Sequence, residues 1–397
     1  MKFKTPKKIV VLIFLCLSFG AGFFINQKIN EYILKNLYTF DSINLFKIAE
    51  VWSEIEGSFI FDDQIDKDKM TYAAIKGIIS TLDDPYTSFY TPEEAKEFMQ
   101  EIEGSFEGIG IQIAKKDEQV IVIAPIKNTP AEKIGILAGD IIQKINDEDI
   151  STEDLDSIVK KIKGEKGTFV TLTIKRGSAE KTFKIKRETI KVPTADLEFI
   201  DADAGGKIAI LSIFQFIETT AKDVETEVNK ILNTNNVKGI ILDLRNNPGG
   251  ILGETEKVAS LFLKEEYPIA KECDKNYDCR YLISSGPGKL RDFKIAILIN
   301  KGTASAAEIL TGALEANIED LTIIGETSFG KGLVQKVMPL SNGSLLKITA
   351  EKWYTPREKL IHEIGIEPDI KIEITEEDLQ NKKDPQLEKA IEIINNK

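Results

Sequence analysis

The sequence has few of the histidine and cysteine residues on which the commonest hydrolytic and metal-binding sites depend. It contains one histidine, His362, and three cysteines. His362 lies in a polar stretch, which disfavours a catalytic triad that uses histidine as its base. The chain also lacks an excess of positive charge, because 52 basic and 64 acidic residues give a net charge of −12. This balance argues against a nucleic-acid binder.

The three cysteines occur in two different settings. Cys16 lies inside an apolar run, and the bulky Leu15 before it makes a lipoprotein site a poor interpretation. Cys273 and Cys279 lie in a polar segment, where two thiols without a nearby histidine are too few to bind a metal ion. Outside the cytoplasm such a pair can oxidise. We therefore predict a disulfide in preference to free thiols, and neither a metal ion nor a cofactor.

The amino terminus has the pattern of a membrane segment. Lysines at positions 2, 4, 7 and 8 precede an uncharged run over residues 9–25, which as a helix would span about 25 Å, near the short limit for crossing a bilayer. The basic flank favours an amino end in the cytoplasm. We favour an uncleaved signal anchor, and the alternative is a signal peptide cleaved near Gly20, Ala21 and Gly22. The body is then predicted on the extracytoplasmic side of the membrane, anchored to it or released from it if the signal is cleaved.

Ser305 stands between a predicted strand and a predicted helix. The apolar run at residues 294–300 indicates a buried strand, and residues 309–314 carry apolar side chains at helical spacing. The hydroxyl group is therefore expected at the carboxyl end of a parallel strand, where α/β sheets place their sites. A serine that only caps the helix is the structural alternative.

With histidine so scarce, a serine nucleophile needs another proton acceptor. Lys331 lies between two glycines, after an apolar run at residues 321–325 that predicts the next strand of the same sheet. Two consecutive strand ends can bring Ser305 and Lys331 together. The lysine would have to be neutral, and burial in an apolar pocket can lower its pKa accordingly.

A glycine-rich turn supplies a third candidate part. Residues 239–245 predict a strand, and Asn-Asn-Pro-Gly-Gly at 246–250 leads into a helical run. Consecutive glycines leave backbone N–H groups free to converge on one point, as an oxyanion hole requires. Gly249, Gly250 and Ala306 are the candidate donors. An ordinary turn is the alternative.

Three motifs together resemble those of the carboxyl-terminal processing peptidases, which are tail-specific Ser-Lys proteases. The motifs are Asp-Leu-Arg-Asn-Asn-Pro-Gly-Gly at 243–250, Gly-Thr-Ala-Ser-Ala-Ala-Glu at 302–308 and Gly-Glu-Thr-Ser-Phe-Gly-Lys-Gly-Leu-Val-Gln at 325–335. The resemblance implies that Ser305 is the nucleophile, that Lys331 is the general base and that Gln335 positions the lysine. Thr303 and Ala307 depart from the pattern, because the family often has serines there.

Residues 105–190 have the pattern of a small β-rich module and resemble a PDZ domain of the bacterial protease type. Gly-Ile-Gly-Ile at 108–111 opens a predicted strand, and Pro-Ala-Glu at 130–132 and Leu-Ala-Gly-Asp at 137–140 follow. A PDZ domain offers loop N–H groups to the terminal carboxylate of a peptide that adds as a strand. An ordinary β-module with glycine turns is the alternative. The peptide-binding candidates are Gly108, Ile109, Gly110, Ile111, Leu155 and Ile158.

The predicted fold is an α/β catalytic body, a twisted sheet with flanking helices, with an inserted β-rich PDZ domain and a helical amino-terminal region. The predicted parts are a signal anchor or signal peptide (1–29), a helical region (30–104), a PDZ domain (105–190), a Ser-Lys peptidase domain (191–372) and a charged tail (373–397). The resemblance implies an extracytoplasmic serine endopeptidase that recognises the free carboxyl terminus of protein or peptide substrates. A catalytically inactive PDZ scaffold on the membrane surface is the competing hypothesis, and the intact Ser-Lys-Gln set disfavours it. Assembly into a homo-oligomer is left open.

Overall fold

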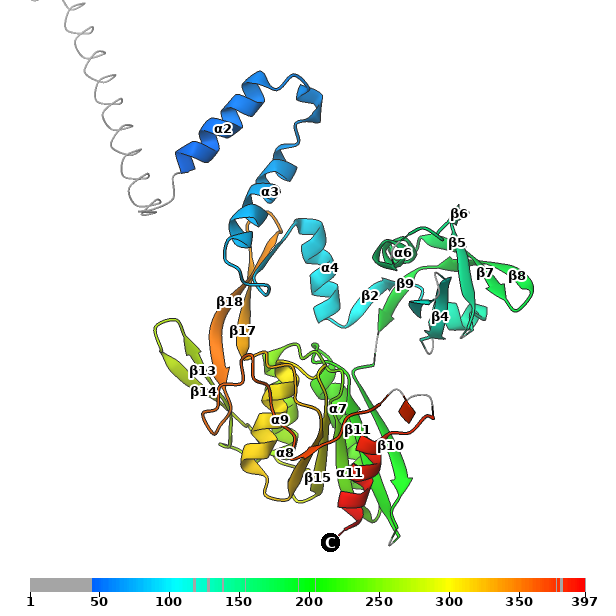
Figure 1. Ribbon diagram of the computed structural model, residues 1–397, viewed down its shortest axis with the longest axis vertical. Coiled ribbons are helices and arrows are strands. Elements are labelled where there is room, and N and C mark those ends of the chain that lie inside the picture. Colours follow the sequence, from blue (N-terminus) through cyan, green and yellow to red (C-terminus); the bar gives the residue numbers. More distant parts are fainter. Residues whose placement is uncertain are drawn as a thin grey trace, which may run out of the picture. The chain divides into compact units, whose positions relative to one another are not determined.

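The computed structural model describes most of the chain after its amino-terminal segment. The described ranges are residues 45–116, 119–126, 129–137, 139–153, 155–191, 193–203, 205–375, 377–378 and 381–396. The predicted signal segment, residues 1–29, lies outside the described residues. Within the described ranges no helix combines the length and the apolar character needed to cross a membrane. The chain divides into two compact units between Ala74 and Ile75 (Figure 1).

The first unit is helical. Its described part contains α2 (Leu45–Ser58), the short 3-10 helix η1 (Asp62–Gln64) and the beginning of α3 (Lys67–Ser80). Lys67 pairs with Glu56 at 2.7 Å and joins the start of α3 to α2. The prediction of a helical amino-terminal region is confirmed for these residues.

The second unit is built on a six-stranded sheet that carries the serine. The strand order is β10 (Ala195–Asp201), β11 (Lys207–Ile213), β12 (Val237–Asp243), β15 (Lys294–Ile299), β16 (Leu321–Gly325) and β19 (Ile370–Lys371). Only β10 pairs antiparallel among these strands, and β15 and β16 are parallel neighbours as predicted. Their carboxyl ends therefore meet at one edge of the sheet.

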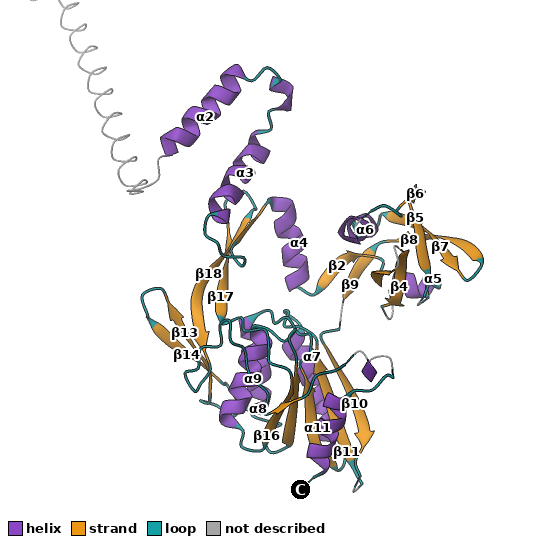
Figure 2. Ribbon diagram, viewed as in Figure 1, coloured by secondary structure: helices purple, strands orange, loops and turns teal. Residues whose placement is uncertain are grey.

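Helices cover both faces of this sheet, as Figure 2 shows. On one face α7 (Thr220–Asn233), α8 (Leu252–Phe262) and α9 (Ala306–Asn317) pack on alternate residues of the strands, including Ile295, Ile297 and Ile299 of β15. The intervening residues, Ala296 and Leu298, pack on the opposite face with α11 (Pro385–Asn395). This alternation is that of a strand buried on both faces. The predicted α/β body is confirmed.

The charged carboxyl-terminal tail proves to be part of this body. Helix α11 buries Ala390 and Ile394 against the sheet, and Asp384 caps its first turn by accepting a hydrogen bond from the N–H of Leu387. Asp384 also pairs with Arg245 at 2.8 Å. In the sequence, the apolar residues of the tail are interspersed with many charged ones. Whether the tail packs on the body could therefore not be predicted from the sequence.

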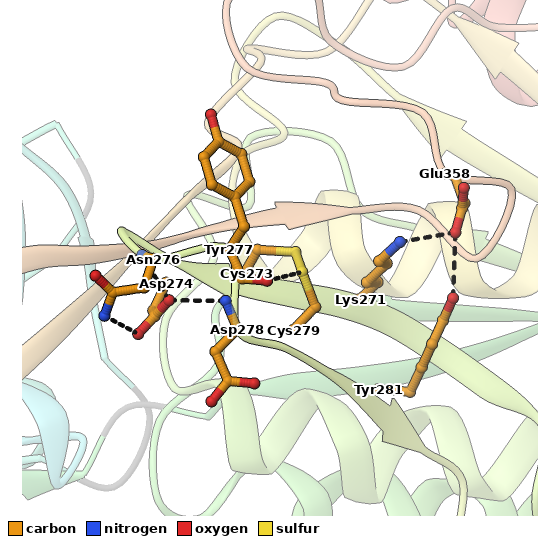
Figure 3. The surroundings of a disulfide bond; sticks show 9 residues. All are labelled: Lys271, Cys273, Asp274, Asn276, Tyr277, Asp278, Cys279, Tyr281 and Glu358. Atoms are coloured by element: carbon orange, nitrogen blue, oxygen red, sulfur yellow. Dashed lines mark hydrogen bonds and ion pairs between the residues drawn. A yellow bond between two sulfur atoms is a disulfide. The ribbon is translucent and has the colours of Figure 1, made fainter.

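A second sheet carries the lysine side of the site. It contains β1 (Ser88–Tyr90), β13 (Pro268–Asp274), β14 (Cys279–Ile283), β17 (Leu333–Pro339) and β18 (Leu345–Tyr354). The helix α4 (Pro92–Ile102) follows β1. A disulfide joins Cys273 to Cys279 across the β13–β14 hairpin, and Lys271 and Tyr281 meet Glu358 beside it (Figure 3). The predicted cysteine pair is therefore bonded in this structure.

The β-rich module lies between β2 (Ser105–Gly108) and β9 (Glu188–Lys191), which pair with each other. Its main sheet has the order β3 (Ile111–Lys116), β4 (Gln119–Pro125), β5 (Ile141–Ile145), β7 (Phe169–Arg176) and β8 (Ala179–Lys186), and β6 (Glu148–Asp149) pairs with β5. Two helices, α5 (Pro130–Ile134) and α6 (Leu155–Ile162), complete it. Strand β3 forms one edge of the sheet and can accept an added strand.

Candidate active site

Ser305 lies where the sequence predicts, between β15 and the first residue of α9. Its backbone has φ +51° and ψ −117°, a conformation that is uncommon for a residue other than glycine. Such backbone strain is concentrated at functional sites. The side chain is half-buried and lines a cleft of about 460 Å³. The other predicted residues in this cleft are Gly249, Gly250, Ala306, Lys331 and Gln335.

Lys331 lies in the same cleft, in the loop between β16 and β17. Its Nζ atom is 4.6 Å from the centroid of the Tyr86 ring. Burial lowers the pKa of Lys331 first, the nearby charge of Lys347 lowers it further, and Asp84 and Glu308 oppose the change. No described residue accepts a hydrogen bond from Nζ or forms an ion pair with it. Burial in the cleft therefore makes the neutral amine more accessible than it is in an exposed lysine.

Glu308 joins the serine segment to the lysine loop. Its side chain is 0% exposed. Its carboxylate accepts hydrogen bonds from the N–H groups of Ser305 at 2.8 Å, Gly330 at 2.7 Å and Lys331 at 2.9 Å, and from the hydroxyl of Ser328. Burial raises the pKa of Glu308, and the four donors oppose that rise. Sequence reasoning missed this residue, although a glutamate three places after a helix-capping serine is a recognisable signal.

The glycine turn approaches Ser305 closely. A Cβ atom on Gly249 would lie 2.7 Å from the Cβ atom of Ser305 and 2.8 Å from the nitrogen of Ala306. However, the N–H of Gly249 donates to Oδ1 of Asn247 at 2.9 Å. The prediction that this N–H belongs to the oxyanion hole does not fit the structure, because the donor is already used. Within the described chain the N–H groups of Gly250 and Ala306 donate to no acceptor, so they remain the candidate pair.

Gln335 lies on β17, two residues after that strand begins. It lines the cleft, but its Nε2 atom is buried and has no hydrogen-bond partner among the described residues. The orienting contact with Lys331 that the resemblance implies is therefore not formed in this structure. The role of Gln335 stays a prediction.

A family model for peptidase family S41 matches residues 207–372, and a PDZ domain model matches residues 108–186. The CtpA-like serine protease of Staphylococcus aureus is 39% identical over 355 residues, which cover 89% of this chain and 68% of that protein. The chain belongs to peptidase family S41. Both matched ranges fall inside the predicted domains at 191–372 and 105–190.

Other relatives of this member of family S41 support the same assignment. The CtpA-like serine protease of Staphylococcus epidermidis is 40% identical over 331 residues, which cover 83% of this chain and 65% of that protein, so the chain spans less than two thirds of that relative. The solved photosystem II D1 C-terminal processing protease has a TM-score of 0.52 and 26% identity, over 83% of this chain and 89% of that one. The predicted resemblance to carboxyl-terminal processing peptidases is confirmed.

One further solved structure supports the fold alone. An S41 protease from Bacteroides fragilis has a TM-score of 0.55 at 16% identity, over 86% of this chain and 96% of that one.

The PDZ candidates divide into two groups. Gly108 ends β2, and Gly110 has φ +79° and abuts Thr129, so the turn between β2 and β3 needs glycine. Ile109 and Ile158 are 0% exposed in the domain core, against which Ile111 packs. The side chain of Ile158 therefore lines no open pocket in this structure, and the peptide-binding role of these positions stays a prediction. The resemblance to a PDZ domain named these positions and did not separate core from groove. The side chain of Leu155 lies outside the described residues.

His362, which the sequence places in a polar stretch, lies against the loop that carries Lys331. It is half-buried, and its backbone packs on Gly332, where an added Cβ would lie 2.7 Å from the nitrogen of His362. Its Nδ1 atom is buried without a hydrogen-bond partner among the described residues. It does not line the cleft of Ser305 and Lys331.

Over the described part of the chain, no cluster of potential ligands could hold a metal ion.

Proposed function

We propose that this S41 peptidase is a serine endopeptidase that cleaves protein substrates after recognising their carboxyl-terminal tails. The observation that carries the proposal is the shared cleft, in which Ser305 faces the same space as Lys331, a lysine whose pKa burial lowers. A neutral lysine beside a serine hydroxyl is a nucleophile with its base. The relatives, which are named as serine proteases and as a C-terminal processing protease, agree with this function.

The proposed reaction uses an acyl-enzyme intermediate. Neutral Nζ of Lys331 takes the proton of Ser305 Oγ while Oγ forms a bond to the carbonyl carbon of the scissile peptide. The N–H groups of Gly250 and Ala306 would stabilise the resulting oxyanion. Collapse breaks the C–N bond, and the lysine gives its proton to the leaving amine. Water then attacks the ester while Lys331 accepts its proton. Collapse breaks the bond between the carbonyl carbon and Oγ, and the lysine returns the proton to Oγ, which releases the new carboxyl terminus and restores Ser305.

We further propose that the body acts outside the cytoplasm and that residues 1–29 hold it at the membrane. The disulfide between Cys273 and Cys279 supports this location, because such bonds persist in oxidising compartments. The basic flank before residues 9–25 supports the orientation.

The decisive test is cleavage of an unstructured protein by the full 397-residue chain in detergent micelles. Wild type should generate new amino termini, and the Ser305→Ala variant should generate none. A hydrophobic fluorophosphonate should label wild type and leave Ser305→Ala unlabelled. Absence of both cleavage and labelling would reject the peptidase and favour the inactive scaffold.

A second prediction concerns tail recognition by the PDZ domain. The N–H groups of Ile109 and Gly110 donate to no described residue, and β3 beside them is a sheet edge, so a terminal carboxylate and an added strand could bind there. Amidating the carboxyl terminus of a substrate removes the charge and should lower kcat/KM by roughly tenfold. The matched control is an amidated substrate with one aspartate added at its last position. Its side chain restores the lost negative charge without restoring the terminal carboxylate. Equal rates for free and amidated tails would contradict tail reading.

A further inference from the structure

The active-site cleft has an unusual set of charges for this chain. Its lining includes two lysines, Lys331 and Lys347, and no aspartate or glutamate. The remaining lining is mostly apolar, with residues such as Ile217, Ile251 and Ile309. The chain as a whole carries a net charge of −12. Because Lys331 serves as a neutral base in the proposed mechanism, Lys347 is the remaining positive charge of the cleft lining, and no lining carboxylate balances it.

The proposed mechanism uses Lys331 but gives no task to Lys347. Lys347 lies on β18, is half-buried and pairs with Ser88 of β1 in the strand register. Its Nζ atom lies 5.6 Å from the ring centroid of Tyr90 and 5.7 Å from that of Phe98. These two rings are stacked, with centroids 4.8 Å apart. Aromatic faces hold an ammonium group in place without neutralising its charge.

Neighbouring lysines of the same sheet are satisfied differently. Lys336 of β17 pairs with Glu351 at 2.7 Å, and Lys271 of β13 pairs with Glu358 at 2.8 Å. No described carboxylate lies within ion-pair distance of Lys347. A half-buried charge without a counter-charge is costly, and an anion that enters the cleft relieves that cost.

We propose that Lys347 forms a subsite in the active-site cleft that binds a carboxylate of the substrate. The inference rests on the proposed peptidase function. The carboxylate has two sources, an acidic side chain near the scissile bond or the terminal carboxylate of a short product-like tail. Both would form a charge-assisted hydrogen bond with the ammonium group, which the stacked rings of Tyr90 and Phe98 keep aimed.

Lys347 also influences the general base, Lys331. The charge of Lys347 lowers the pKa of Lys331. Removing that charge would raise the pKa of Lys331 and therefore slow the cleavage of every substrate at neutral pH. Loss of the subsite, in contrast, slows only the cleavage of substrates that carry the carboxylate. Rates must be compared at a pH where wild-type activity has reached its plateau, and the diagnostic quantity is the ratio between paired substrates.

The experiment uses a carboxyl-amidated peptide in which glutamate or glutamine is scanned through each position around the scissile bond. In wild type, glutamate at one position should raise kcat/KM by about three- to tenfold over glutamine. Lys347→Gln should bring this ratio to about one, and Lys347→Arg should preserve it. A second arm compares the glutamine peptide with a free and with an amidated terminus. If only the free terminus depends on Lys347, the terminal carboxylate is the source.

Two further measurements separate the possible failures. Binding of the glutamate and glutamine peptides to the Ser305→Ala chain, measured by fluorescence anisotropy, tests the subsite even if the protein is not a peptidase. Thermal melting checks that Lys347→Gln is folded. Two results would overturn the proposal. One is a wild-type kcat/KM that is the same for glutamate and glutamine at every position and for free and amidated termini. The other is a preference for the carboxylate that is unchanged in folded Lys347→Gln. Cleavage without any such preference rejects the subsite and leaves the peptidase standing.

Discussion

The Lys331→Ala variant should lose about 10⁴-fold or more in kcat/KM, as hydrolases do when the base of the nucleophile is removed. Because the neutral amine is the active form, wild-type activity should rise with pH through the pKa of Lys331, which burial lowers. Activity should therefore appear at a lower pH than an exposed lysine would allow. Steady-state kinetics over the pH range measures both effects.

The control for this variant is His362→Ala, since His362 lies outside the cleft. Its kcat/KM should fall by no more than about tenfold, because it can act only through packing on Gly332. A histidine variant as inactive as the lysine variant would overturn the Ser-Lys assignment.

Stability gives an independent measure of the same lysine. Protonated Lys331 is disfavoured in the folded state, so Lys331→Met should be inactive without being less stable. Between the lowered folded pKa and the higher unfolded pKa, the unfolded chain binds the extra proton, so wild-type stability should rise with pH relative to Lys331→Met. Denaturation at several pH values measures this difference, and a slope of the opposite sign would show that the fold favours the charged lysine.

The strand pattern was enough to place the two central residues. Apolar runs before Ser305 and Lys331 predicted consecutive strands, and β15 and β16 are parallel neighbours whose carboxyl ends meet. Because α/β sheets place their sites at the carboxyl ends of strands, this topology predicts that the two side chains lie in one cleft. This inference needs only the local pattern and the topology of a parallel sheet.

Other features depended on contacts that no local pattern records. The N–H of Gly249 is satisfied by Asn247 two residues earlier, and the glycine is required because Ser305 lies against it. Whether a buried isoleucine such as Ile158 faces a core or a groove is decided by the opposing strands. The stacked rings beside Lys347 come from β1 and α4, far from β18 in sequence.

Replacing Glu308 with alanine should damage both stability and activity, because the carboxylate is the link between the nucleophile and its base. The change leaves four donors without their acceptor, three of them backbone N–H groups, in a buried site. We expect a loss of about 3 kcal/mol in the free energy of unfolding, seen as a thermal midpoint lowered by roughly 5–10 °C. Because Ser305 and Lys331 would lose their common anchor, kcat/KM at a permissive temperature should fall by about 100-fold.

The isosteric variant separates positioning from general stability. Glu308→Gln keeps one acceptor oxygen, but in either orientation its amide NH2 group must face at least one N–H donor, so it should recover part of the stability and little of the activity. The matched control is Glu315→Gln on the same helix, where the side chain is partly exposed and pairs with Arg357. That variant should match wild type in both measurements, since a surface ion pair contributes at most about 1 kcal/mol. Wild-type kcat/KM in folded Glu308→Ala would show that Ser305 and Lys331 are positioned without this carboxylate.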